Sequence, residues 1–127
     1  MLINTPISLG ELVDKISILI IKKKNISDLI KLEHVTKELE FLQKTLKEYI
    51  SEDKINKFIQ QLININSKLW KIEDDIRECE RKKIFDQTFT DLARSVYFTN
   101  DERAKVKNDI NKTFGSELVE VKSYEEY

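Results

Sequence analysis

Apolar residues recur along most of the chain at alternating steps of three and four, a spacing typical of helices that pack on one another. The first series consists of Leu32, Val35, Leu39, Leu42, Leu46 and Tyr49. The second series consists of Ile55, Phe58, Leu62, Ile65, Leu69, Ile72, Ile76 and Cys79. Because only the short polar segment 51–54 separates the two series, the pattern predicts a long antiparallel helical hairpin.

The second hairpin helix carries an additional apolar stripe, formed by Ile59, Ile63 and Trp70. One stripe can face the first hairpin helix while the other faces a further helix, which predicts a three-helix core. Since two stripes are more than one hairpin partner covers, we also expect a homodimer or a complex with another protein.

The segment before the hairpin predicts an apolar helix. Ser8 and Glu11 have the spacing of a capping box, in which the serine side chain caps the first turn. Apolar residues then follow on several faces: Leu12, Val13, Ile16, Ile18, Leu19, Ile20 and Ile21. A helix this apolar is expected to be central, with partners on more than one side.

The last third of the chain predicts two shorter helices and a tail. Phe85, Phe89, Leu92 and Val96 mark the first of these helices. Residues 99–102 form a second capping-box pattern, which predicts a new helix that ends at Gly115. Residues 118–124 alternate only in part, so they fit either an extended tail or a frayed turn of helix.

Taken together, these elements predict an all-α fold: a helical bundle built on the long hairpin, with residues 1–127 as a single domain. The composition agrees, because 127 residues with two Gly and one Pro leave few of the turn residues that a β-rich fold needs. The longest apolar run is residues 18–21, so no membrane span is expected. The single Cys fits a reducing cytoplasm.

Composition and charge also exclude several kinds of chemistry. The net charge of −1 gives no signature of binding to nucleic acid. Two glycines are too few for a phosphate-binding glycine loop. With one His, His34, and one Cys, Cys79, the chain offers no zinc site, and His34 should face solvent. We therefore expect no cofactor and no metal.

Charged residues beside the apolar stripes are the remaining candidates for a site. Only four Arg stand against 18 Lys, and a guanidinium suits phosphate or carboxylate, so one hypothesis is an anion pocket built from Arg94, Arg103 and Lys107. Arg103, Lys107 and Asn111 form one helical stripe. The alternative is that the charges only pair at helix boundaries, as Glu11 with Lys15 and Glu73 with Arg77 can do at four-residue spacing.

Several segments of this chain together resemble an uncharacterised family of small all-helical proteins: SLGELVDKI (8–16), LWKIED (69–74), LARSVY (92–97), TND (99–101), RA (103–104), GSELVE (115–120) and KSY (122–124). Its members occur in bacteria near glycosyltransferase and polysaccharide genes, and in marine bacteriophages. The resemblance implies that site residues lie among the polar positions of this pattern: Glu11, Asp14, Lys15, Glu73, Asp74, Arg94, Asn100, Asp101, Arg103, Lys107, Glu120 and Lys122.

The sequence thus favours a non-catalytic protein of the cytoplasm, or of the host cytoplasm if a phage encodes it. It would act as an interaction module or bind a small anion, with a link to glycan metabolism or to phage function. The alternative is a Mg²⁺-dependent enzyme for a phosphorylated or nucleotide-sugar substrate. In that case Glu11, Asp14 or Glu73 would serve as base or metal ligand.

Overall fold

A computed structural model describes all residues 1–127. Four helices make up the fold: α1 (Leu9–Asn25), α2 (Leu29–Tyr49), α3 (Glu52–Lys82) and α4 (Gln87–Phe114). There is no strand, so the predicted all-α class is confirmed. None of the four helices combines the length and the apolar character that crossing a bilayer requires.

Local capping residues set the ends of the helices. The Ser8 side chain accepts a hydrogen bond from the N–H of Glu11 at 3.1 Å, as the capping box predicts. α2 is capped by Asp28, whose carboxylate accepts from the N–H of Lys31. At its other end α4 stops at Gly115, which takes the left-handed conformation with φ of 69°.

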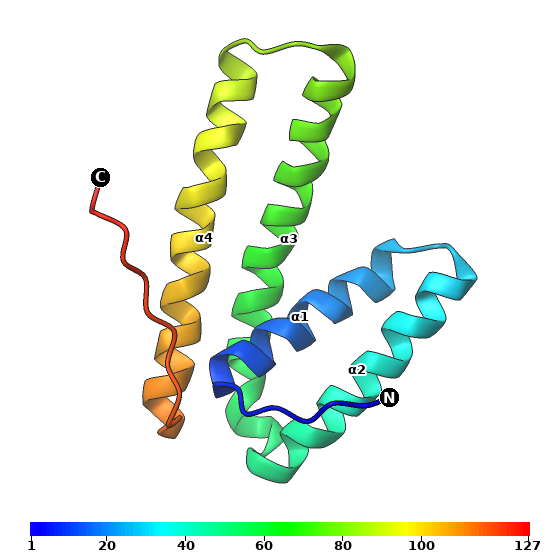
Figure 1. The fold of residues 1–127 in the computed structure, drawn as a ribbon, viewed down its shortest axis with the longest axis vertical. Coiled ribbons are helices and arrows are strands. Elements are labelled where there is room, and N and C mark those ends of the chain that lie inside the picture. Colours follow the sequence, from blue (N-terminus) through cyan, green and yellow to red (C-terminus); the bar gives the residue numbers. More distant parts are fainter.

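The pairing of the helices differs from the predicted hairpin. α1 packs against α2, α3 and α4, and α3 packs against α4, whereas α2 and α3 share no extended interface (Figure 1). The prediction that the N-terminal helix is central is therefore confirmed, and the prediction that α2 and α3 form a hairpin is wrong. The apolar stripe of α2 packs on α1, because α1 is apolar on most of its surface and offers it a partner.

The main apolar cluster lies where α1 crosses the lower half of α3 and α4. Its 11 residues come from all four helices: Leu12, Val13, Ile16, Leu19, Val35, Leu39, Leu46, Ile55, Phe58, Leu62 and Ile110. Beyond this crossing the upper half of α3 and α4 extends without a further helix beside it (Figure 1). The core is therefore concentrated at one end of the molecule.

α4 is one continuous helix where the sequence predicted two. Thr99, the expected cap of a second helix, lies inside α4 and is buried. No Gly or Pro interrupts residues 87–114, so the helix passes through the capping-box pattern. The true cap is Asp86, whose side chain accepts from the N–H of Phe89 at 3.3 Å.

The residues after α4 form an extended tail, which decides between the two predicted alternatives. Residues 116–127 have no regular secondary structure, and the tail runs back along α4 (Figure 1). Near its end the Tyr127 ring meets Tyr97 and Phe98 edge-on, and its hydroxyl donates to Asp101. This bond with Asp101 raises the pKa of Tyr127 to about 12.

Gly10 allows α1 and α4 to approach closely. A Cβ at this position would lie 2.5 Å from the carbonyl oxygen of Lys107, inside van der Waals contact with backbone. The N–H of Gly10 also donates to Oδ1 of Asn111 at 2.7 Å. Only glycine fits this crossing without moving one of the helices.

Replacing Gly10 with alanine should therefore lower the free energy of unfolding by about 1–3 kcal/mol, because the methyl group forces α1 and α4 apart. Urea unfolding followed by circular dichroism measures this loss. Thr113→Ala, an exposed change on α4, serves as the control and should stay within about 0.5 kcal/mol of the wild type. Equal stability of Gly10→Ala and the wild type would contradict the close approach.

Candidate functional site

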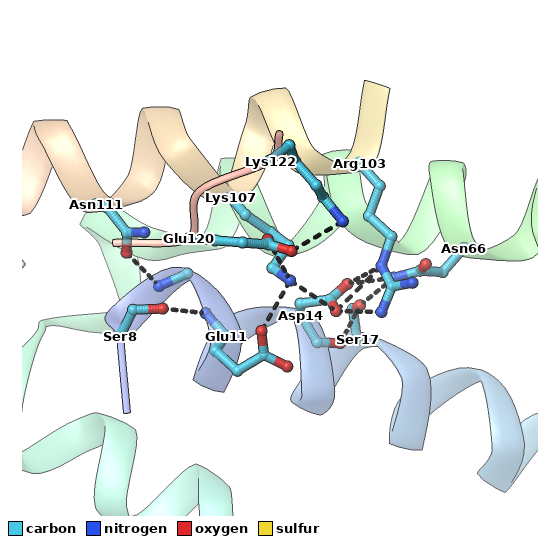
Figure 2. Close-up of polar contacts among 11 residues, drawn as sticks. Ser8, Glu11, Asp14, Ser17, Asn66, Arg103, Lys107, Asn111, Glu120 and Lys122 are labelled. Carbon is cyan, nitrogen blue, oxygen red and sulfur yellow. Dashed lines mark hydrogen bonds and ion pairs between the residues drawn. The ribbon is translucent and has the colours of Figure 1, made fainter. Parts of the chain in front are cut away.

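The centre of the polar site is the carboxylate of Asp14, which is 1% exposed on α1. Arg103 of α4 donates hydrogen bonds to this carboxylate through two nitrogens: Nε lies 3.0 Å from Oδ1 and Nη2 lies 2.5 Å from Oδ2 (Figure 2). Such two-point contacts of a guanidinium with a carboxylate are among the strongest hydrogen bonds in proteins. The same contact raises the pKa of Arg103.

A second element, α3, reaches Asp14 through Asn66. The Asn66 side-chain amide donates to Oδ1 of Asp14 at 2.9 Å and to Oγ of Ser17 at 2.8 Å. Ser17 in turn donates to the carbonyl oxygen of Asp14 at 2.6 Å. All three of these side chains are buried, so α1, α3 and α4 are joined by one hydrogen-bonded network.

Lys107 lies next to Asp14 and is held by three carboxylates. Its side chain is 7% exposed, and its Nζ lies 2.8 Å from Glu11, 2.9 Å from Glu120 and 4.0 Å from Asp14. Burial alone would lower the pKa of Lys107, but the hydrogen bonds with Glu11 and Glu120 outweigh it and the pKa is raised. Lys107 is therefore a buried cation at ordinary pH.

Glu120 connects the extended tail to this cluster. One of its oxygens pairs with Lys107, and the other lies 3.0 Å from Nζ of Lys122, also on the tail. The hydrogen bond from Lys107 holds the pKa of Glu120 below its ordinary value. The finished cluster contains three acids and three cations, so its formal charge is zero: Glu11, Asp14, Glu120, Arg103, Lys107 and Lys122.

A hollow of about 250 Å³ opens beside the cluster, and we call it the polar hollow. Its lining residues are Glu11, Asn100, Arg103, Ala104, Lys107, Glu120 and Lys122. Arg103 makes no hydrogen bond through Nη1, because Asp14 engages only Nε and Nη2. The polar hollow is thus lined by cations that retain unused hydrogen-bond donors.

The structure brings together several of the residues that the sequence singled out. Glu11, Asp14, Arg103 and Lys107 meet in the cluster, and Asn100 lines the polar hollow beside them. The stripe of Arg103, Lys107 and Asn111 faces α1, in agreement with its four-residue spacing (Figure 2).

The other predicted residues lie elsewhere. Lys15 pairs with Glu38 of α2 at 3.0 Å, so the expected Glu11–Lys15 pair is wrong: Glu11 binds Lys107 instead. Asp101 binds Tyr127.

Three further candidates stay on the surface. Glu73 and Arg77 form the predicted pair on the exposed face of α3. The Arg94 guanidinium lies over the Phe98 ring, 5.7 Å from its centre, and does not line the polar hollow.

Sequence reasoning missed two members of the network, Ser17 and Asn66. The sequence does contain a sign of Asn66, because Asn66 occupies the position between Ile63 and Trp70 in the apolar stripe that begins at Ile59. A polar side chain at such a buried position needs a hydrogen-bond partner. Glu120 and Lys122 entered only through the family resemblance, since a tail without periodicity does not reveal which helix it contacts.

The donor set does not suit the Mg²⁺ alternative. Both oxygens of Asp14 accept hydrogen bonds from Arg103, and Glu73 lies on the exposed face of α3. No group of three or more acidic, His or Cys side chains is placed to hold a metal ion. Mg²⁺ requires several such oxygens around one point.

The fold and this site define an all-α protein in which a neutral, partly buried ion cluster joins α1, α4 and the tail, and Asn66 links this cluster to α3. The chain belongs to the family of unknown function DUF6165, whose model matches residues 3–127. Comparisons with the curated proteins and with the solved structures find no match. The predicted membership of an uncharacterised helical family is confirmed to this extent.

Asp14→Asn should destabilise the protein by about 3 kcal/mol or more, because Arg103 and Lys107 then lose the charge that compensates them. Chemical denaturation measures the difference. Glu73→Gln is the matched control, since it removes one carboxylate from an exposed pair with Arg77 and should cost at most about 1 kcal/mol. Similar decreases in the free energy of unfolding for both variants would show that Asp14 stabilises the fold no more than an exposed carboxylate does.

The pair of Glu120 and Lys107 should make the tail contact dependent on pH at both extremes. Because the pKa of Glu120 is lowered in the folded state, the ionised Glu120 adds to the free energy of unfolding. This contribution is complete above the ordinary pKa of 4.5 and is lost as the pH falls through the lowered value. Because the pKa of Lys107 is raised in the folded state, the contribution of its ammonium group to the free energy of unfolding is complete below the ordinary pKa of 10.5. It is lost as the pH rises through the raised value. NMR titration of the two side chains tests both directions, and a Glu120 that titrates at or above 4.5 would contradict the pairing.

Proposed function

We propose that this protein is a non-catalytic module that binds a small anion in the polar hollow. One observation carries the proposal: the cations that neutralise the buried acids also line an open hollow, where Arg103 keeps Nη1 free of protein partners. The Asn100 amide and the Lys122 ammonium line the same space. Acceptor-rich anions are the ligands that such a set of donors selects.

Glu120 indicates how an anion would be held. Its carboxylate is bound by two ammonium groups, Lys107 at 2.9 Å and Lys122 at 3.0 Å. It is also 28% exposed, so it has access to water and can turn outward. With Glu120 turned away the cluster carries one excess positive charge, which an anionic ligand can compensate.

The size of the polar hollow favours a compact ligand. Its volume of about 250 Å³ is below the roughly 300–1,000 Å³ of pockets for drug-sized molecules. The resemblance to proteins encoded beside glycosyltransferase and polysaccharide genes, or by bacteriophages, makes a sugar phosphate the first organic probe. We place the protein in the cytoplasm, where such phosphorylated compounds occur and a single thiol stays reduced.

Calorimetric titration with inorganic phosphate, sulfate and glucose 1-phosphate tests the proposal. Glu120→Gln should tighten binding about tenfold, roughly 1.4 kcal/mol, since it removes the internal competitor. Lys122→Met should weaken binding about fivefold, roughly 1 kcal/mol, and should leave the fold intact because Lys122 is on the exposed tail.

Arg94→Met is the matched control for this series. It removes one positive charge from an exposed position on α4 that does not line the polar hollow, so it should leave the affinity unchanged. No binding by wild type and by Glu120→Gln would overturn the proposal. Equal weakening by Arg94→Met and Lys122→Met would reduce it to nonspecific attraction of anions.

A further inference from the structure

The upper half of α3 and α4, residues 67–98, lacks a third layer, and we call it the distal hairpin. Asn66 is the last residue of α3 before it and still binds Asp14 of α1. Beyond this point α1 and α2 turn away, and the two helices continue alone (Figure 1). Of the residues in the distal hairpin only Ile72 is buried.

The distal hairpin nevertheless keeps the apolar spacing of a packed bundle. Its half-exposed apolar residues are Leu69, Trp70, Ile76, Cys79, Phe89, Leu92 and Val96, and Ile84 and Phe85 at the turn are exposed. Two helices alone leave both sides of such a stripe open to water, whereas four helices enclose it. Tyr97 and Phe98 do not belong to this set, because Tyr127 of the tail packs edge-on against both rings.

The accessible surface of the whole chain is large for its mass. It measures 9329 Å², whereas a compact monomer of 15.1 kDa is expected to expose about 7,100 Å². The excess is greater than the roughly 800 Å² that each partner buries in a stable interface of standard size. The chain thus has enough uncovered surface for a dimer.

The charges of the distal hairpin favour a second copy as the partner. Seven Lys and Arg stand against seven Asp and Glu in residues 67–98, so the segment is neutral and does not repel itself. Neighbouring charges are also paired within it, as in Lys71 with Asp75, Glu73 with Arg77 and Arg81 with Glu78. The distal hairpin therefore has no excess of one charge that would attract a strongly charged partner.

We propose that two copies of this chain pair through their distal hairpins and form a four-helix bundle around a two-fold axis. The apolar stripes of the two hairpins then become one core, and the paired charges form its solvated rim. This proposal is independent of the polar hollow, because none of the residues that line the hollow belongs to residues 67–98.

The single Trp of the chain provides a direct test, because Trp70 is half-exposed and lies in the proposed interface. Sedimentation equilibrium of the wild type should show the mass rising from 15.1 kDa to twice that value with concentration. The Trp70 emission should move to shorter wavelength over the same range. A mass of 15.1 kDa at all concentrations with unchanged emission would overturn the proposal.

Phe85→Glu and Phe41→Glu form a matched pair of variants. Phe85 is 55% exposed in the distal hairpin, where it contacts Phe89, and Phe41 is 45% exposed on α2, outside the distal hairpin. Phe85→Glu should weaken dimerisation about tenfold or more. Phe41→Glu should leave it unchanged. The opposite result would move the interface to α2 and overturn the proposal, and circular dichroism confirms that each variant keeps its helices.

Discussion

The carboxylate of Asp14 is almost completely withdrawn from water, and this single charge dictates what the neighbouring helices must supply. Burying an ion costs several kcal/mol unless good partners surround it, so α4 has to deliver Arg103 and Lys107 and α3 has to deliver Asn66. Apolar contacts alone would tolerate small shifts of these helices along one another. The hydrogen bonds to Asp14 do not, and they therefore fix the register in which three of the four helices meet. α2 contributes nothing to this network and packs on α1 through apolar side chains.

The same requirement links stability to the proposed ligand site. The cations that balance Asp14 and Glu11 lie where α1 and α4 meet, and the tail adds Glu120 and Lys122 at that place. An anion site of this kind needs no separate scaffold, because the helix junction already holds the charges in position. Arg103 both neutralises Asp14 and lines the polar hollow, so its replacement would change stability and affinity together. The exposed residues of the tail are better suited to changing the affinity without changing the fold.

Much of the architecture could be predicted from local signals, and the remainder depends on contacts between distant segments. Ser8 and Gly115 mark helix ends because their chemistry acts within one turn. The apolar spacing identifies which faces are buried, but Val35 and Leu39 contain no information on which helix covers them, and here it is α1. The capping-box pattern at Thr99 was overridden because the helix continues and buries that side chain. In the site, charges on one stripe were found from their spacing, whereas Asn66 and the partners on the tail required the folded structure.

The close approach of α1 and α4 joins residues that are far apart in the sequence. Gly10 bonds to Asn111 across 101 positions, and Asp14 to Arg103 across 89. During synthesis α1 therefore leaves the ribosome long before the groups that neutralise its acid exist. Until α4 has been synthesised, the carboxylate of Asp14 stays hydrated. During this time the apolar faces of α1 either remain exposed or pack on α2, the next helix to emerge. The arrangement makes completion of the core a late event that depends on the second half of the chain.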